Sequence, residues 1–354
     1  MIDYNSRIKK IQKTMDCDCL FLVSREFEPN VYYFTGFKGG NLGILLIFKN
    51  KEPIFISSKL DMGNVQNKQI KKLIYTKSLD DIFKKYIGLH KAIGINAGYL
   101  NVAQYNSLKK ILKPSKIIDF SRVLTEQRAV KDKYEIQQTK KAAKEISEIV
   151  GSAIKNMSKF NSEIDVKNFI EFEIVRRGYE RSFETIVASG KNAANPHYVV
   201  CKDKLRRGFL VMDCGLKVNG YCSDITRTVF LGNPTKKEIG EYNRLLDVQL
   251  KCIEILKTKK ISEANDFAKK ELGSAYIHSL GHGIGLEIHE FPAMDSRNHN
   301  RLIKGNCFTV EPGVYHKGKF GIRIEDDLIQ ENDSLKVITP ITKKLIIINK
   351  KIYK

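Results

Sequence analysis

The sequence contains no long apolar segment, no CxxC pair of cysteines and no secretion signal. Apolar runs such as residues 44–48 and 345–348 are far shorter than the roughly 18 residues that a membrane-spanning helix needs. The seven cysteines are odd in number and scattered, which argues against a disulfide framework and against a cysteine zinc site. Residues 1–13 are polar and lack an apolar core followed by a cleavage site. These absences predict a cytoplasmic protein without a membrane partner.

The formal net charge of +21 is not concentrated in one basic region. Lysine and arginine total 61 against 40 for aspartate and glutamate, and the lysines are spread along the chain in pairs such as Lys9-Lys10 and Lys109-Lys110. No basic block with interleaved aromatic residues occurs. We therefore expect a solvated, lysine-rich surface and consider a nucleic-acid partner unlikely.

Length and composition indicate a globular protein with about two domains, since the chain has 354 residues, 42% of them hydrophobic and 29% charged. Short apolar strands and amphipathic helices alternate in the first third, and the pattern changes near residues 121–128. We predict an α/β (α+β) protein with a smaller domain at residues 1–124 and a second domain at residues 125–354. In the first domain we expect helices at 6–15 and 102–112 and strands at 19–23, 42–48, 53–57, 92–96 and 116–120.

The second domain is predicted to open with a long amphipathic helix. From Asp132 onward, apolar residues such as Ile136, Ala143 and Val150 fall on one helical face. Gly178 is a candidate C-cap for a following helix. The other elements expected in this domain are helices at 163–177 and 236–256 and strand-like stretches at 185–188, 208–231, 307–310 and 321–329.

Two aspartates stand on either side of a predicted β-hairpin. Asn219-Gly220, between two β-prone runs, is a strong signal for a two-residue turn. That turn pairs Asp213 with Thr226, and Asp224 has the same parity as Thr226, so both aspartates face the same side. Cys214 and Cys222 then point to the opposite side, which indicates packing. Two carboxylates at this spacing can share a metal centre, and a carboxylate buried in an apolar strand needs a cation or hydrogen-bond donors.

Three further segments of the second domain carry residues that could bind metal ions. His282 and His289 stand seven residues apart and are separated by glycines that allow close backbone packing. The pattern is neither the zincin motif nor a dinucleotide-binding loop. Glu311 ends an apolar strand, and Arg323 and Glu325 alternate with isoleucines, so they share one face of a strand.

In this order the five segments around Asp213, Asp224, His282, Glu311 and Glu325 resemble the ligand set of the pita-bread metallopeptidases. This superfamily includes methionine aminopeptidases, Xaa-Pro aminopeptidases, prolidases and creatinase. Residues 30–37 also resemble part of the creatinase/prolidase amino-terminal domain, which methionine aminopeptidases generally lack. The resemblance thus implies a creatinase/prolidase-like domain followed by a pita-bread catalytic domain, and it favours the proline-directed branch.

The resemblance implies two divalent metal ions held by four carboxylates and one imidazole. Such an oxygen-rich set favours Mn or Co, with Zn or Fe possible. Asp213 would bind one ion, His282 and Glu311 the other, and Asp224 and Glu325 would bridge both.

The resemblance also assigns residues to catalysis and to the substrate. Glu311 is the candidate general acid/base, and the candidate catalytic histidines are His289 and His197, both on the substrate side. Arg323 would either fix a ligand carboxylate or bind the substrate. Phe183, Tyr198 and Phe291 are candidates for a proline pocket.

We therefore expect an Xaa-Pro dipeptidase (prolidase) that acts on a proline-containing dipeptide or short peptide and forms a homodimer. An Xaa-Pro aminopeptidase acting on longer peptides is the alternative, and a creatinase-like hydrolase or a non-catalytic binding scaffold is less favoured. Some prolidases have an arginine shortly after the second histidine motif, which can hold the dipeptide carboxylate. Here that position is Ala293, and the next arginine is Arg297.

Overall fold

The computed structural model describes residues 2–75, 79–88, 91–114, 116–332 and 334–349. The chain forms two compact units, Met1–Arg128 and Ala129–Lys354. Each unit combines helices with β-sheet, which confirms the predicted α/β class. The predicted domain boundary between residues 124 and 125 falls inside helix α5 (Ser121–Ala129).

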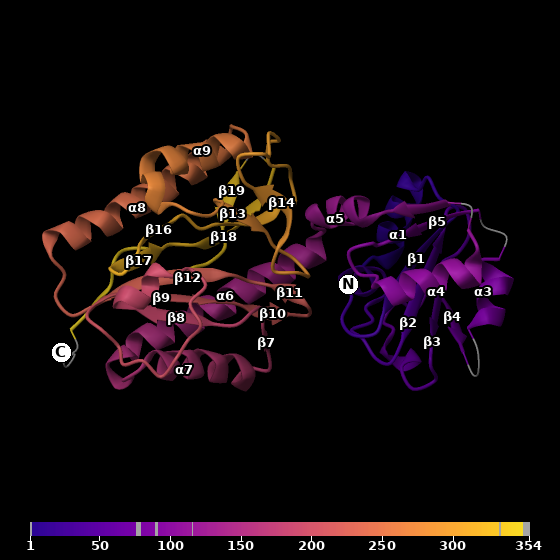
Figure 1. Ribbon diagram of the computed structural model, residues 1–354, viewed down its shortest axis with the longest axis horizontal. Coiled ribbons are helices and arrows are strands. Elements are labelled where there is room, and N and C mark those ends of the chain that lie inside the picture. Colours follow the sequence, from indigo (N-terminus) through magenta and orange to yellow (C-terminus); the bar gives the residue numbers. More distant parts are fainter. Residues whose placement is uncertain (1, 76–78, 89–90, 115, 333, 350–354) are drawn as a thin grey trace. The chain divides into compact units, whose positions relative to one another are not determined.

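The amino-terminal unit is built on a six-stranded sheet in the order β4-β3-β2-β1-β5-β6 (Figure 1). Its strands are β1 (Cys19–Ser24), β2 (Gly43–Phe48), β3 (Ile54–Ser57), β4 (Lys71–Ile74), β5 (Ala92–Ile95) and β6 (Lys116–Asp119). Its helices are α1 (Tyr4–Thr14), α2 (Pro29–Thr35), η1 (Met62–Asn64), α3 (Asp80–Tyr86), α4 (Val102–Leu112) and α5. Strand β2 pairs with β3 in antiparallel orientation.

The carboxy-terminal unit contains two larger sheets, β20-β12-β9-β8 and β14-β13-β15-β18-β19, and the smaller sheets β11-β10-β7 and β16-β17. The helices are α6 (Lys133–Lys155), η2 (Met157–Lys159), α7 (Glu163–Arg176), η3 (Gly190–Ala194), α8 (Lys236–Leu256), α9 (Ile261–Leu272) and η4 (Gly273–Ala275). The first strands are β7 (Glu180–Arg181), β8 (Ile186–Ser189), β9 (Gly208–Cys214), β10 (Leu216–Val218), β11 (Tyr221–Cys222) and β12 (Ile225–Leu231). The later strands are β13 (Gly281–Gly283), β14 (Glu290–Met294), β15 (Cys307–Val310), β16 (Gly313–His316), β17 (Phe320–Arg323), β18 (Asp326–Gln330), β19 (Leu335–Val337) and β20 (Ile347–Ile348).

The helix α6 begins and packs as its sequence predicts. The Asp132 side chain accepts from the Glu135 backbone N–H, and the Glu135 side chain returns the contact to the Asp132 N–H, which forms a capping box. Its buried face includes Ala143, Ile146 and Val150. The next helix, α7, ends at Arg176, and Gly178 follows with φ +79°, as its predicted capping role requires.

Two helical layers cover the strands of the carboxy-terminal unit (Figure 1). The even-numbered residues of β9, Leu210 and Met212, join the apolar core of α6 and α7. Phe209, on the other face of β9, packs with Phe230 in the core of α8 and α9. Because side chains alternate along a strand, Asp213 shares the face of Phe209 and points away from α6 and α7.

The predicted strand-like stretch 321–329 is two strands instead of one. β17 pairs with β16, whereas β18 pairs with β15. At the change of partner, the Ile324 N–H donates to the Pro312 carbonyl and the Glu325 N–H donates to the Thr226 carbonyl. Glu325 therefore lies in a short connection between two strands.

Within the described ranges, no helix is long and apolar enough to cross a membrane.

Candidate metal centre

The β9–β12 hairpin brings the first two predicted ligands together. Asn219 and Gly220 both have positive φ, and Asp213 pairs with Thr226, which confirms the register predicted from the turn. Asp224 lies directly before β12, and its backbone N–H donates to Asp327 Oδ2 over 2.9 Å. Both aspartates are buried and line the same cavity.

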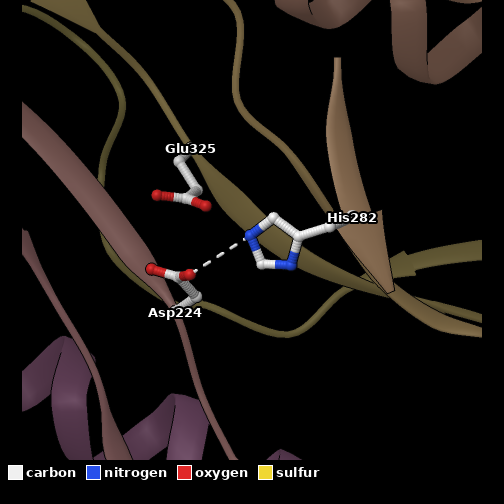
Figure 2. A group of neighbouring side chains, drawn as sticks. All are labelled: Asp224, His282 and Glu325. Carbon is white, nitrogen blue, oxygen red and sulfur yellow. Dashed lines mark ion pairs between the residues drawn. The ribbon is translucent and has the colours of Figure 1, made fainter. Parts of the chain in front are cut away.

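The remaining three ligand candidates come from three other strands or connections. His282 lies in β13, Glu311 follows β15, and Glu325 joins β17 to β18. His282 Nε2 lies 3.5 Å from Asp224 Oδ2 and 3.3 Å from Glu311 Oε1. Figure 2 shows Asp224, His282 and Glu325 pointing toward one another, and their ligand-capable atoms lie within 4.8 Å of each other.

Glycines around His282 allow the strands to approach this closely. A Cβ atom at Gly281 would lie 2.2 Å from the Thr309 carbonyl oxygen. A Cβ atom at Gly283 would lie 2.3 Å from the backbone of Phe291. No larger residue fits at either position without moving backbone, so the spacing that the sequence suggested has a steric cause.

All five ligand candidates line one cavity of about 540 Å³, which also contains His197 and His289. Three of the four candidate ligand carboxylates have an oxygen without a hydrogen-bond partner among the described residues: Asp213 Oδ1, Asp224 Oδ1 and Glu325 Oε1. Unpaired buried charges are costly, and a cation would satisfy these atoms. Four carboxylates and one imidazole fit hard or borderline divalent ions.

The electrostatics of the cluster agree with a site built for positive charge. Burial raises the pKa of Asp224 well above its usual value, and the nearby Glu325 and Asp213 raise it further. Burial also raises the pKa of Glu325, with Glu311 and Asp213 adding to the effect. At Asp213 burial again raises the pKa, although Arg323 opposes it. The carboxylates of the cluster therefore carry more negative charge than the neighbouring Arg323 offsets.

The guanidinium group of Arg323 is hydrogen-bonded to three neighbouring side chains. Its Nε donates to Thr226 Oγ1 over 3.0 Å, one terminal nitrogen donates to the Tyr315 hydroxyl over 2.9 Å, and the other donates to Asp213 Oδ2. Thr226 in turn donates to Glu325 Oε2 over 2.6 Å. Of the two roles predicted for Arg323, the geometry matches the fixing of a ligand carboxylate.

Sequence reasoning missed three polar residues around this cluster. Thr226 was paired with Asp213 but given no part in the site. The ring nitrogen Nε2 of His278 lies 3.0 Å from the Tyr315 hydroxyl, and burial lowers the pKa of His278. Thr226 could have been found from the hairpin register. His278 and Tyr315 meet only through the tertiary fold.

The two histidines predicted for the substrate side come from different segments of the chain. The ring of His289 is 4.3 Å from that of His282, and its pKa is lowered by burial and by the nearby His282. His197 lies in the loop after η3, near Asn192, whose amide donates to the Tyr198 hydroxyl over 3.0 Å and to the buried Glu163. Both histidines reach the cavity that holds the ligand candidates.

Two of the three aromatic candidates for a proline pocket line the cavity. Phe183 and Tyr198 line the cavity. Phe291 is 44% exposed and is not among the described lining residues of this cavity. Ala293 pairs with His282 across the β13–β14 ladder, and Arg297 is bound to Asp295 at the surface.

The sequence matches two known families in the order predicted. Residues 137–331 match metallopeptidase family M24, and residues 6–130 match the creatinase/prolidase N-terminal domain. An Xaa-Pro dipeptidase of Pyrococcus horikoshii is 31% identical over 355 residues, which cover 97% of this chain and 99% of the relative.

Solved structures share the whole architecture. The structure of an Xaa-Pro dipeptidase from Bacillus anthracis superposes with a TM-score of 0.88 at 31% identity, covering 98% of this chain and 99% of the other. An X-Pro aminopeptidase from Thermotoga maritima gives a TM-score of 0.85 at 28% identity, covering 96% of this chain and 100% of the other. Both kinds of enzyme thus match this chain over nearly its whole length.

Proposed function

The chain belongs to metallopeptidase family M24, and from this premise we propose that it is an Xaa-Pro dipeptidase, hydrolysing the peptide bond that precedes proline. The observation that carries the proposal is the convergence of the five ligand candidates in one cavity, with buried carboxylate oxygens that lack partners. The similarity to Xaa-Pro dipeptidases over the full length supports the substrate class.

Asp213, Asp224, His282, Glu311 and Glu325 would hold two divalent ions, for which we propose Mn or Co. When bound, such ions polarise the scissile carbonyl and make water a better nucleophile near neutral pH. Arg323 holds Asp213, and Thr226 holds Glu325, so the ligand carboxylates are oriented before any substrate arrives.

Glu311 is the proposed proton carrier. Its Oε1 accepts from Thr309 Oγ1 over 3.2 Å, and its side chain is partly open to the cavity. It would take a proton from the attacking water and deliver it to the proline nitrogen as the C–N bond breaks. The nitrogen leaves as a secondary amine, and the acyl carbon keeps the oxygen of the water.

His289 and His197 are the proposed substrate-side groups. An imidazole N–H of His289 would donate to the oxygen that becomes negative when the carbonyl is attacked. His197 would contact the peptide from the loop after η3. Phe183 and Tyr198 offer apolar surface to the proline ring.

The test uses protein treated with chelator and refilled with Mn²⁺ or Co²⁺. An Xaa-Pro dipeptide and an Xaa-Pro-Yaa tripeptide are compared by kcat/KM. We expect the dipeptide to be cleaved better. Preference for the tripeptide would indicate the alternative, an Xaa-Pro aminopeptidase, which the similarity to the Thermotoga maritima structure keeps open. Cleavage of neither peptide, with creatine-like compounds hydrolysed instead, would contradict both.

We further propose a homodimer in the cytoplasm. All seven cysteines are free, as a reducing compartment allows. Gel filtration with light scattering measures the mass, and a monomer would contradict the first part of this proposal.

A further inference from the structure

A dipeptide ends in a carboxylate directly after the proline ring, and the proposed function therefore needs a cation for it in the cavity. Among the described residues that line the cavity, two side chains carry a permanent positive charge, Arg323 and Lys167. Each donor nitrogen group of Arg323 is already bound to Thr226, Tyr315 or Asp213. Breaking that set would leave buried polar groups unpaired.

Lys167 is held in a way that allows its partner to be exchanged. It projects from α7, and its side chain is 17% exposed. Its Nζ lies 2.7 Å from Glu184 Oε2 and 3.9 Å from Glu171 Oε1. Glu184 is 65% exposed and is also paired with Arg181, so it keeps a cation when Lys167 turns away. Exposed ion pairs of this kind contribute little to stability.

We propose that Lys167 binds the free carboxylate of the dipeptide, with its ammonium group leaving Glu184 for the substrate. The proposal rests on the proposed dipeptidase function and adds the residue that distinguishes a peptide ending at proline from a longer or amidated one. The arginine that follows the second histidine motif is less well placed to supply this charge, because Arg297 is outside the described lining of the cavity and its side chain is 90% exposed.

The test compares kcat/KM for an Xaa-Pro dipeptide with kcat/KM for its C-terminal amide. In Lys167→Met the ratio of acid to amide should fall about 10- to 100-fold, the range for loss of one charged hydrogen bond. Lys167→Arg should keep most of the ratio. Glu184→Gln, which removes the nearest carboxylate partner of the ammonium group, should leave the ratio as high as in the wild type or higher.

Lys140 provides the matched control. It is also a helical lysine that pairs with a glutamate, at 2.9 Å from Glu331, but it is not among the described lining residues. Lys140→Met should leave the ratio unchanged. An equal loss for acid and amide in Lys167→Met would assign Lys167 a structural role and overturn the proposal, as would a larger loss on a tripeptide than on the dipeptide.

A binding measurement separates this proposal from the proposed function. The probe is a dipeptide whose scissile carbonyl is reduced to a methylene group, prepared as acid and as amide, and titrated into metal-loaded protein by calorimetry. Tighter binding of the acid, lost in Lys167→Met, supports the role of Lys167 even if no Xaa-Pro peptide is hydrolysed, a result that would contradict the proposed function alone. Equal binding of acid and amide by the wild type would overturn the proposal for Lys167.

Discussion

Strand β18 buries carboxylates on both of its faces, and the two faces treat them differently. On one face Asp326 accepts hydrogen bonds from Arg227, Gln249, Thr339 and Lys343 at 2.6 to 2.9 Å. Burial alone would raise the pKa of Asp326, but Arg227 and Lys343 outweigh it and lower the pKa. This carboxylate is fully buried and fully paired.

On the other face the neighbouring carboxylates lack that support. Glu325 Oε1 and Asp327 Oδ1 have no partner among the described residues. Burial raises the pKa of Asp327 well above its usual value, with the Asp224 N–H as the main opposing contact. Glu325 shifts in the same direction.

The contrast separates structural burial of charge from functional burial. Asp326 and Glu325 are both buried, so desolvation opposes ionisation on each face. Only the Asp326 face supplies enough internal cations and donors to offset it. On the Glu325 face the protein itself leaves carboxylate oxygens unpaired, and the proposed binding of an external cation would explain why this is tolerated.

The largest effect on activity is expected at Glu311, which lines the same cavity as Glu325. Glu311→Gln removes both the proposed proton carrier and a proposed ligand, so kcat/KM for an Xaa-Pro dipeptide should fall at least about 1,000-fold. The measurement uses metal-refilled protein, with circular dichroism to show that the fold is kept. A fall below tenfold would contradict the assigned role.

On the Asp326 face, substitution of the paired carboxylate should lower the stability of the protein. Asp326→Asn leaves Arg227 and Lys343 buried without their counterion, and the free energy of unfolding should fall by about 3 kcal/mol. Urea denaturation measures it. Asp295→Asn, which breaks the exposed pair with Arg297, is the control and should cost less than about 1 kcal/mol. Equal losses for the two variants would remove the distinction between the faces.

Added metal ions should stabilise the protein by binding to the carboxylates on the Glu325 face, with no contribution from Asp326. At a free Mn²⁺ or Co²⁺ concentration 100 times Kd, binding should add about 2.7 kcal/mol to the free energy of unfolding. The rise in Tm of chelated protein on refilling measures the effect. It should be lost in Asp224→Asn and kept in Asp326→Asn. A metal response that survives Asp224→Asn would place the ion elsewhere.

Much of the local structure followed from short-range sequence signals. The Asn219-Gly220 turn fixes the register that pairs Asp213 with Thr226, because a two-residue turn leaves one way to close the ladder. The Asp132 cap and the apolar spacing after it predict α6 for the same local reason.

The parts that could not be predicted depend on partners far away in the chain. The break between β17 and β18 arises because the two strands pair with different neighbours, which residues 321–329 do not encode. Asp326 and Glu325 look alike in the sequence, and only the positions of Arg227 and Lys343 give them opposite environments. The commitment of Arg323 to Tyr315 is likewise a tertiary contact.

The smallest expected effect is the change in the free energy of unfolding caused by Glu325→Gln. Its sign should depend on whether metal is bound, so it tests the difference between the Glu325 face and the Asp326 face directly. Without metal, Glu325→Gln replaces a buried carboxylate that Glu311 and Asp213 repel, and it should raise the free energy of unfolding by about 1 kcal/mol near pH 7. With Mn²⁺ or Co²⁺ present, the same change removes a proposed bridging ligand and should lower stability relative to the wild type. Paired urea titrations with chelator and with metal measure both signs. A Glu325→Gln protein that is less stable than the wild type under both conditions would show that this carboxylate, like Asp326, is held by the protein itself.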